Sequence, residues 1–143
     1  MSDPGGPSDR SGPSDPSGPP CPCGTGAALA SCCGRYLDGQ RHAPTAEALM
    51  RARYSAHALG DVEFLRRSWH PDTRPSTVTD PGVTWVRLDV RGHERGGQLD
   101  ARGTVDFVAH YRSGEGPGVL AERSRFERVG TRWLYVDGEP LDA

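Results

Sequence analysis

Hydrophobic and polar positions divide the chain into a helix-forming part and a strand-forming part. Between residues 45 and 58 the apolar side chains recur at spacings of three and four, the period of a helix with one buried face. Thr45 precedes this stripe as a candidate N-cap, and Gly60 follows it at a C-terminal cap position. A second, shorter helix is predicted over 62–69, where Pro71 stops it. The stripe of the first helix consists of Ala46, Leu49, Met50, Tyr54, His57 and Ala58.

Beyond residue 82 the hydrophobic period changes to two, which is typical of strands with one buried face. The alternation predicts four strands, at 83–91, 99–112, 120–129 and 132–137. Short glycine-containing turns separate them, so neighbouring strands are expected to pair antiparallel. In the first strand, Val86, Leu88 and Val90 are predicted to share one face. Helices followed by a run of strands indicate an α+β fold, with a bent sheet wrapped on two helices.

The first 20 residues have a different composition from the rest of the 143-residue chain. They contain five Ser, six Pro and four Gly, and no aliphatic side chain follows Met1. Such a segment cannot form a packed core, so we expect 1–20 to be a disordered tail. The remaining pattern predicts a small cysteine-containing module at 21–40 and a larger domain at 44–139.

Charge and hydropathy argue against several classes of protein. The formal net charge of −2 is that of the tail, and the rest of the chain has equal numbers of Arg and acidic residues. A balanced charge argues against nucleic acid as a partner, because binding to phosphates needs a basic surface. The chain has no apolar run long enough to span a membrane and no apolar segment typical of a secretion signal. We therefore expect a cytoplasmic protein without membrane insertion.

Four cysteines lie within thirteen residues, in the pattern C-x-C-x8-C-C. They are Cys21, Cys23, Cys32 and Cys33. In a reducing compartment such a cluster predicts a metal site, and four thiolates suit a closed, tetrahedral, structural Zn²⁺ site. Disulfide or redox use and an iron–sulfur cluster are the alternatives that the spacing leaves open.

The residues between the cysteines predict how the chain turns around a metal. Pro22, Gly24 and Gly26 favour a tight turn that aims backbone N–H groups at sulfur. Residues 27–33 are predicted to form a short helix, with Gly34 as its left-handed cap. A segment this short has no core of its own, so metal binding would supply its folding free energy.

A second candidate site is a ligand pocket between helices and sheet. Glu122 shares a strand face with Ser124 and Phe126, so we expect its carboxylate to be partly buried and either paired with an arginine such as Arg53 or used as an acid or base. The pocket candidates are Tyr54, His57, Trp69, His70 and Glu122. Other polar candidates are Asp106, His110, Arg123 and Arg125.

No phosphate-binding loop, dinucleotide fingerprint, nucleophile elbow or H-E-x-x-H motif occurs in the sequence. The leading hypothesis is therefore a zinc-binding protein with a binding or adaptor role, whose partner is a protein or a small molecule. The alternative is a small-molecule enzyme of the isomerase, hydratase or lyase type that uses the pocket. The residues leave the question of enzymatic activity open.

Two resemblances to known families rest on these motifs. The run Cys-Pro-Cys-Gly-Thr-Gly at 21–26, with Cys-Cys-Gly at 32–34, resembles the SEC-C motif, which implies that all four cysteines are zinc ligands. The segments 44–61, 68–75, 105–111, 122–126 and 132–138 are similar to the bacterial YchJ family of uncharacterised proteins. This resemblance implies an amino-terminal SEC-C module and a nuclear transport factor 2-like domain, a cone-shaped antiparallel sheet over helices.

Overall fold

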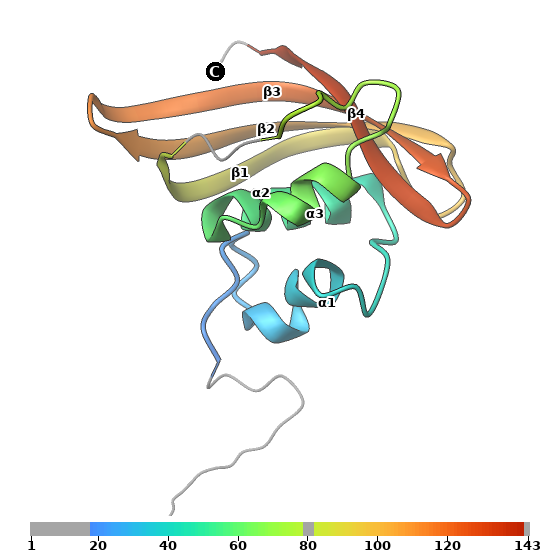
Figure 1. The fold of residues 1–143 in the computed structure, drawn as a ribbon, viewed down its shortest axis with the longest axis horizontal. Coiled ribbons are helices and arrows are strands. Elements are labelled where there is room, and N and C mark those ends of the chain that lie inside the picture. Colours follow the sequence, from blue (N-terminus) through green and yellow to red (C-terminus); the bar gives the residue numbers. More distant parts are fainter. Residues whose placement is uncertain (1–17, 79–81, 142–143) are drawn as a thin grey trace, which may run out of the picture.

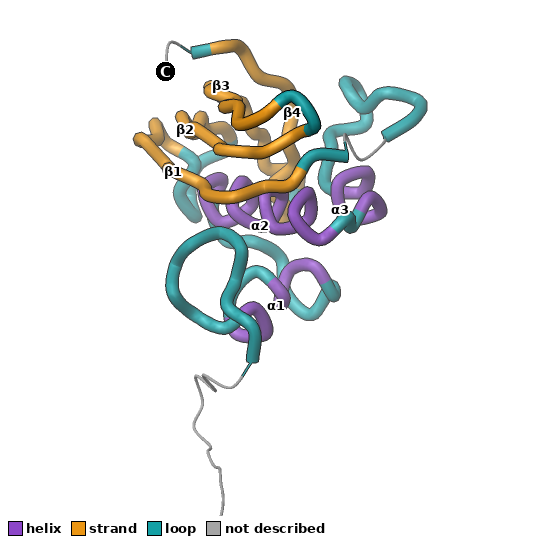
Figure 2. Tube along the Cα trace, turned by 90° about the vertical axis from the view of Figure 1, so that its left-hand side faces the viewer, coloured by secondary structure: helices purple, strands orange, loops and turns teal. Residues whose placement is uncertain are grey.

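The computed structural model describes residues 18–78 and 82–141, which form three layers (Figures 1 and 2). A four-stranded sheet is the first layer, and helices α2 (Ala46–Leu59) and α3 (Val62–Arg67) lie beneath it. The cysteine-containing segment with α1 (Gly34–Leu37) lies on the far side of α2 (Figure 2). Helix α2 therefore separates the cysteines from the sheet.

The sheet consists of β1 (Thr84–Arg95), β2 (Arg102–Ser113), β3 (Gly116–Val129) and β4 (Arg132–Pro140), in the order β1-β2-β3-β4. All neighbouring strands pair antiparallel. The predicted α+β class with a curved antiparallel sheet is confirmed. Strands β1, β3 and β4 are longer than the alternation predicted, whereas β2 begins three residues later than expected, at Arg102. No helix among the described residues combines the length and the apolar character needed to cross a bilayer.

Helix α2 begins and ends where its capping residues predict. The Thr45 hydroxyl accepts a hydrogen bond from the backbone N–H of Ala48 at 3.0 Å, which satisfies one of the free donors of the first turn. Gly60 ends the helix in the left-handed region, at φ 74°. Asp61 then caps α3 by accepting from the backbone N–H of Phe64 at 3.0 Å. These two caps fix the angle at which α3 leaves α2.

Replacing Thr45 by alanine should destabilise the fold by about 1 kcal/mol, because the N–H of Ala48 loses its acceptor. Thr45→Ser keeps the hydroxyl and should stay close to the parent protein. Urea unfolding followed by far-ultraviolet circular dichroism measures both variants. Equal losses for the two substitutions would instead assign the role of Thr45 to packing of its methyl group.

One strand face differs from the prediction. Leu88 is buried and Val90 packs on the core, but Val86 is 59% exposed. A register shift between Trp85 and Arg87 marks a β-bulge, which inserts one residue and inverts the alternation. Trp85 therefore packs on the core in place of Val86.

The helices are attached to the sheet at two close backbone approaches. The N–H of Ala46 donates to the carbonyl of Gly96 at 2.9 Å, where the chain leaves β1 and turns into β2. Gly103 lies on the opposite strand, where an added Cβ would lie 2.5 Å from the backbone nitrogen of Gly96. The second approach joins β4 to the segment that follows α3. The N–H of Tyr135 donates to the carbonyl of Ser68, and the carbonyl of Tyr135 accepts from the N–H of His70.

The predicted tail falls mostly outside the described residues, which begin at residue 18. The next two residues are held by the cysteine-containing segment. The carbonyl of Pro19 accepts from the backbone N–H of Leu29 at 2.8 Å, and Pro20 forms an antiparallel bridge with Ala28.

Candidate metal centre and ligand cavity

Residues 21–40, here called the cysteine knuckle, bring the first pair of cysteines together by a tight turn. Gly24 and Gly26 take φ values of 90° and 89°, as the turn requires. The carbonyl of Cys21 accepts from Gly24 at 3.2 Å, and the N–H of Cys21 donates to Ala27 at 2.9 Å. The backbone N–H groups of Cys23 and Thr25 face the sulfur atoms of Cys21 and Cys23, as predicted.

The second pair of cysteines follows a 3-10 turn, η2 (Leu29–Ser31), instead of the predicted helix over 27–33. Gly34 is also not a left-handed cap; it is the first residue of α1. A Cβ at position 34 would lie 2.7 Å from the carbonyl oxygen of Leu29. Gly34 is therefore needed for close packing of backbone on backbone, since the tight 3-10 turn passes beside it.

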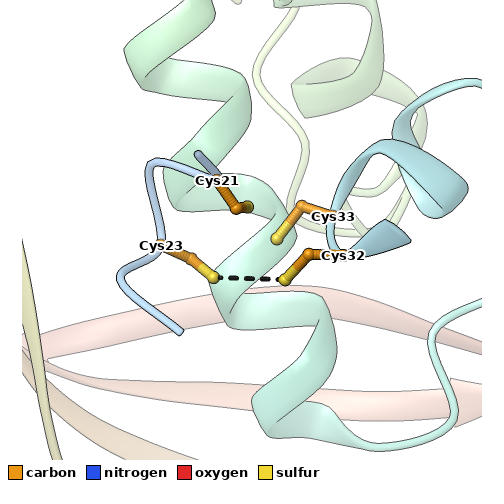
Figure 3. A group of neighbouring side chains, drawn as sticks. All are labelled: Cys21, Cys23, Cys32 and Cys33. Carbon is orange, nitrogen blue, oxygen red and sulfur yellow. Dashed lines mark hydrogen bonds between the residues drawn. The ribbon is translucent and has the colours of Figure 1, made fainter. Parts of the chain in front are cut away.

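The four cysteine side chains converge from these two segments (Figure 3). Their sulfur atoms all lie within 4.8 Å of one another, and those of Cys23 and Cys32 are 3.6 Å apart. Tetrahedral ligands at about 2.3 Å from Zn²⁺ lie about 3.8 Å apart, so this spacing fits one shared ion. All four cysteines are free, and a disulfide would need sulfur atoms about 2.05 Å apart. The four thiols can hold one metal ion.

The electrostatics of the cluster would favour a bound cation. Hydrogen bonding from Cys23 and Cys33 lowers the pKa of the Cys21 thiol well below its usual range. The same hydrogen bond to Cys21 raises the pKa of Cys23, and it raises that of Cys33 strongly. One thiolate therefore keeps its neighbours protonated. A divalent cation at the centre would allow several thiols to ionise together, because it compensates the charge of their thiolates.

The cluster of four cysteines is nearly closed to solvent. Cys21, Cys23 and Cys33 are 5%, 0% and 2% exposed, and Cys32 is partly exposed. The hydroxyl of Thr25 lies 3.2 Å from the sulfur of Cys32 and shields this open side. A site without room for substrate is typical of structural metal sites.

Helix α2 holds the cysteine knuckle in place through two polar contacts. The hydroxyl of the fully buried Ser55 lies 3.5 Å from the sulfur of Cys21. The guanidinium of Arg51 donates to the carbonyl of Cys23 at 3.0 Å and to the carboxylate of Glu47 at 3.0 Å. The cluster of four cysteines therefore lies directly against the helix that supports the sheet.

The opposite side of α2 faces a cavity of about 570 Å³ between the helices and the sheet. Its walls are mainly apolar, and they include seven of the chain's ten Phe, Tyr and Trp residues. The seven are Tyr54, Trp69, Trp85, Phe107, Tyr111, Phe126 and Tyr135. A volume of this size with few polar groups is typical of small-molecule sites.

Arg53 supplies the positive charge of the cavity from within α2. Its Nη1 donates to the carbonyl of Leu65 at 2.9 Å and to the hydroxyl of Ser68 at 2.7 Å. The guanidinium carbon lies 4.4 Å and 5.1 Å from the ring centroids of Tyr135 and Trp69. Burial lowers the pKa of Arg53 to about 10, so the side chain stays charged at neutral pH.

Glu122 supplies the negative charge, and its partners differ from the predicted arginine. Its Oε2 accepts from the Ser124 hydroxyl at 2.5 Å and from the Tyr135 hydroxyl at 3.2 Å. Burial and the charge of Glu122 raise the pKa of Tyr135, so this hydroxyl remains a donor. Gly138 makes room for the carboxylate, since a Cβ there would lie 2.7 Å from Cγ of Glu122. Arg53 acts on Glu122 through space, without a direct ion pair among the described contacts.

The structure brings four of the five pocket candidates together: Tyr54, His57, Trp69 and Glu122 all line the cavity. His70 does not line it, and its Nε2 lies 3.4 Å from a carboxylate oxygen of Glu127.

The other polar candidates lie outside the cavity lining and take part in ion pairs across the strands. Arg123 donates to Asp106 at 2.8 Å, and Arg125 donates to Asp137 at 2.6 Å. His110 lies 2.9 Å from Asp89. These pairs stabilise strand pairing, so these residues do not belong to the pocket.

Two residues of the cavity did not stand out in the sequence as pocket residues. Arg53 lies three and four residues after Met50 and Leu49, on the buried stripe of α2. A charged residue on an apolar stripe is the signal that could have identified it. The hydroxyl of Tyr135 gains a role because β3 places Glu122 next to it.

Comparisons with known proteins agree with this architecture. Residues 45–138 match the family model described as YchJ, middle NTF2-like domain. A UPF0225 protein of Streptomyces coelicolor is 50% identical over 121 residues, which cover 84% of this chain and 94% of the relative. A UPF0225 protein of Chromobacterium violaceum is also 50% identical over 121 residues, covering 81% of this chain and 89% of the relative.

Two solved structures are similar over most of the chain. The solution structure of a SEC-C motif containing protein from Rhodopseudomonas palustris has a TM-score of 0.76 at 35% identity, covering 85% of this chain and 98% of that one. The crystal structure of a SEC-C motif containing protein from Psychrobacter arcticus has a TM-score of 0.70 at 25% identity, covering 86% and 83%. With its cysteine knuckle packed on an NTF2-like domain, this chain belongs to the YchJ family of bacterial proteins.

Proposed function

We propose that this protein is a cytoplasmic zinc-binding protein that uses its cavity to bind a small molecule. The observation that carries the zinc assignment is the convergence of four sulfur atoms within 4.8 Å of one another. Four thiolates in a closed tetrahedral arrangement favour zinc, which has no redox chemistry and no preference for another geometry. The ion has a structural role, since three of its four ligands are buried.

Intact-mass measurement under native conditions tests the zinc assignment. Protein purified anaerobically without chelators should carry one zinc ion per chain. Acidification should release the ion and lower the measured mass of the protein by the mass of zinc. Bound iron with an absorbance band in the visible would contradict the proposal. So would a mass two or four hydrogens below that of the fully reduced chain, which would indicate one or two disulfides. Cys32→Ser, which alters the most exposed ligand, should lower zinc occupancy at limiting metal.

A binding role is supported by the cavity and by the balanced charge of the molecule. The cavity has aromatic walls and one residue of each charge sign, Arg53 and Glu122. Glu122 is held by Ser124 and Tyr135, which favours a fixed recognition group. In this proposal the domain with the cavity carries the binding or adaptor role, and the partner is not a nucleic acid. Turnover of a bound compound by the purified protein would favour the isomerase, hydratase or lyase alternative instead.

A further inference from the structure

The charges of the cavity set limits on the charge of its ligand. Among the described residues that line the cavity, Arg53 is the one Arg or Lys and Glu122 is the one Asp or Glu. Their opposite charges cancel. A charged ligand would cost desolvation energy on burial and would leave the cavity with a net charge. An uncharged ligand leaves the existing balance intact.

The two charged groups also have hydrogen-bonding positions that the described residues do not use. Arg53 is 7% exposed, and its hydrogen bonds to Leu65 and Ser68 both come from Nη1. Its Nε and Nη2 groups donate to no residue in the described part of the chain. Both described hydrogen bonds to Glu122 go to Oε2, which leaves Oε1 as an acceptor. A ligand can therefore accept from the guanidinium and donate to the carboxylate.

The walls favour a flat ligand. Tyr54, Trp85 and Tyr111 pack edge to face at one part of the lining, with ring centroids 5.9 Å and 5.5 Å apart. Trp69 and Tyr135 form another edge-to-face pair at 5.1 Å beside Arg53. Aromatic rings pack on other rings in offset-stacked or edge-to-face arrangements, so these walls suit a planar ring.

We propose that the cavity binds an uncharged, planar ring compound that has a carbonyl acceptor for Arg53 and an N–H donor for Glu122, as in a cyclic amide. This inference rests on the proposed binding function and names its ligand class. Ser124 and Tyr135 are positioning residues, since they hold the carboxylate through Oε2. Gly138 contributes by leaving space beside the same carboxylate.

Four bicyclic probes of similar size test the ligand class on the full-length, zinc-loaded chain. They are 2-quinolone, which has the lactam, naphthalene, which has no polar group, quinaldate, an anion, and N-methylquinolinium, a cation. Titration followed by tryptophan fluorescence should give 2-quinolone a Kd about tenfold lower than each comparator, as expected for hydrogen bonds to charged groups.

Variants assign the recognition to the named groups. Glu122→Gln and Tyr135→Phe should each weaken 2-quinolone binding about fivefold and leave naphthalene binding unchanged. Gly138→Ala should act in the same direction, because its methyl group displaces the Glu122 carboxylate. Glu139→Gln is the matched control: Glu139 lies outside the lining, where it accepts from Arg125. Circular dichroism confirms that each variant is folded before titration.

The outcomes separate the ligand class from the binding function. Tighter binding of naphthalene or of a charged probe than of 2-quinolone overturns the ligand class and keeps the cavity as a binding site. Equal losses of 2-quinolone and naphthalene binding in Glu122→Gln overturn the role of the carboxylate. The absence of saturable binding by all four probes contradicts both the ligand class and the proposed binding function.

Discussion

Replacing Cys23 by alanine should release the metal ion and unfold the cysteine knuckle. Cys23 is fully buried and lies 3.6 Å from the sulfur of Cys32, so no nearby water can replace its sulfur without opening the site. Structural zinc contributes about 10–16 kcal/mol of apparent free energy in small zinc modules, more than a segment of this size can replace by burial. Hydrogen exchange should show loss of protection at the N–H groups of Cys21 and Leu29, which are bonded in the folded knuckle.

Ser31→Ala is the matched control, because it removes one polar atom from the same knuckle without touching the metal centre. The Ser31 hydroxyl donates to the carbonyl of Ala28, so its loss should cost about 1 kcal/mol or less. Zinc content and melting temperature should stay close to those of the parent protein. A Cys23→Ala protein that kept its zinc and its protected amides would show that the metal does not support the knuckle.

Replacing Gly103 by alanine should destabilise the larger domain by about 3 kcal/mol, the upper end of the usual cost of overpacking. The added methyl group would lie 2.5 Å from the nitrogen of Gly96 and 3.1 Å from the carbonyl carbon of Arg95. These are backbone atoms, so relief requires the two strands to separate. The same backbone anchors α2, because Gly96 accepts from Ala46. Thermal unfolding should show a melting temperature lower by about 10 °C.

Gly92→Ala provides the comparison for this prediction. Gly92 lies in β1, and an added Cβ there would meet no atom within 4 Å. The substitution should be neutral or slightly stabilising, since alanine restricts the unfolded chain more than glycine does. If Gly92→Ala and Gly103→Ala lowered the melting temperature equally, loss of glycine flexibility and not the close approach of strands would be the cause.

The amino-acid sequence alone predicted the features that depend on neighbouring residues. The α+β class follows from the change of hydrophobic period near residue 82, and the limits of α2 follow from Thr45 and Gly60. The four cysteines were likewise predicted as a group, because their short separation keeps them close in any compact arrangement. These features depend on residues within one or two turns of the chain.

Tertiary structure decided where the sequence signal was ambiguous. The bulge at Trp85 reversed one face of β1, and the conformation of Gly34 followed from a contact with Leu29. Both outcomes depend on which backbone passes beside the residue. Sequence patterns describe the face of an element, and they do not reveal an inserted residue or a neighbouring carbonyl.

The ligand cavity was decided in the same way. The residues alone indicated that polar side chains such as His57 and Glu122 would lie on faces turned toward the core, and they indicated four candidate metal ligands. Strand pairing and the seating of α2 decided that Tyr135 would hold Glu122 and that Arg53 would face the same space. These contacts join residues 13 or more positions apart, so their hydrogen bonds and charge balance exist only once the sheet has closed over the helices.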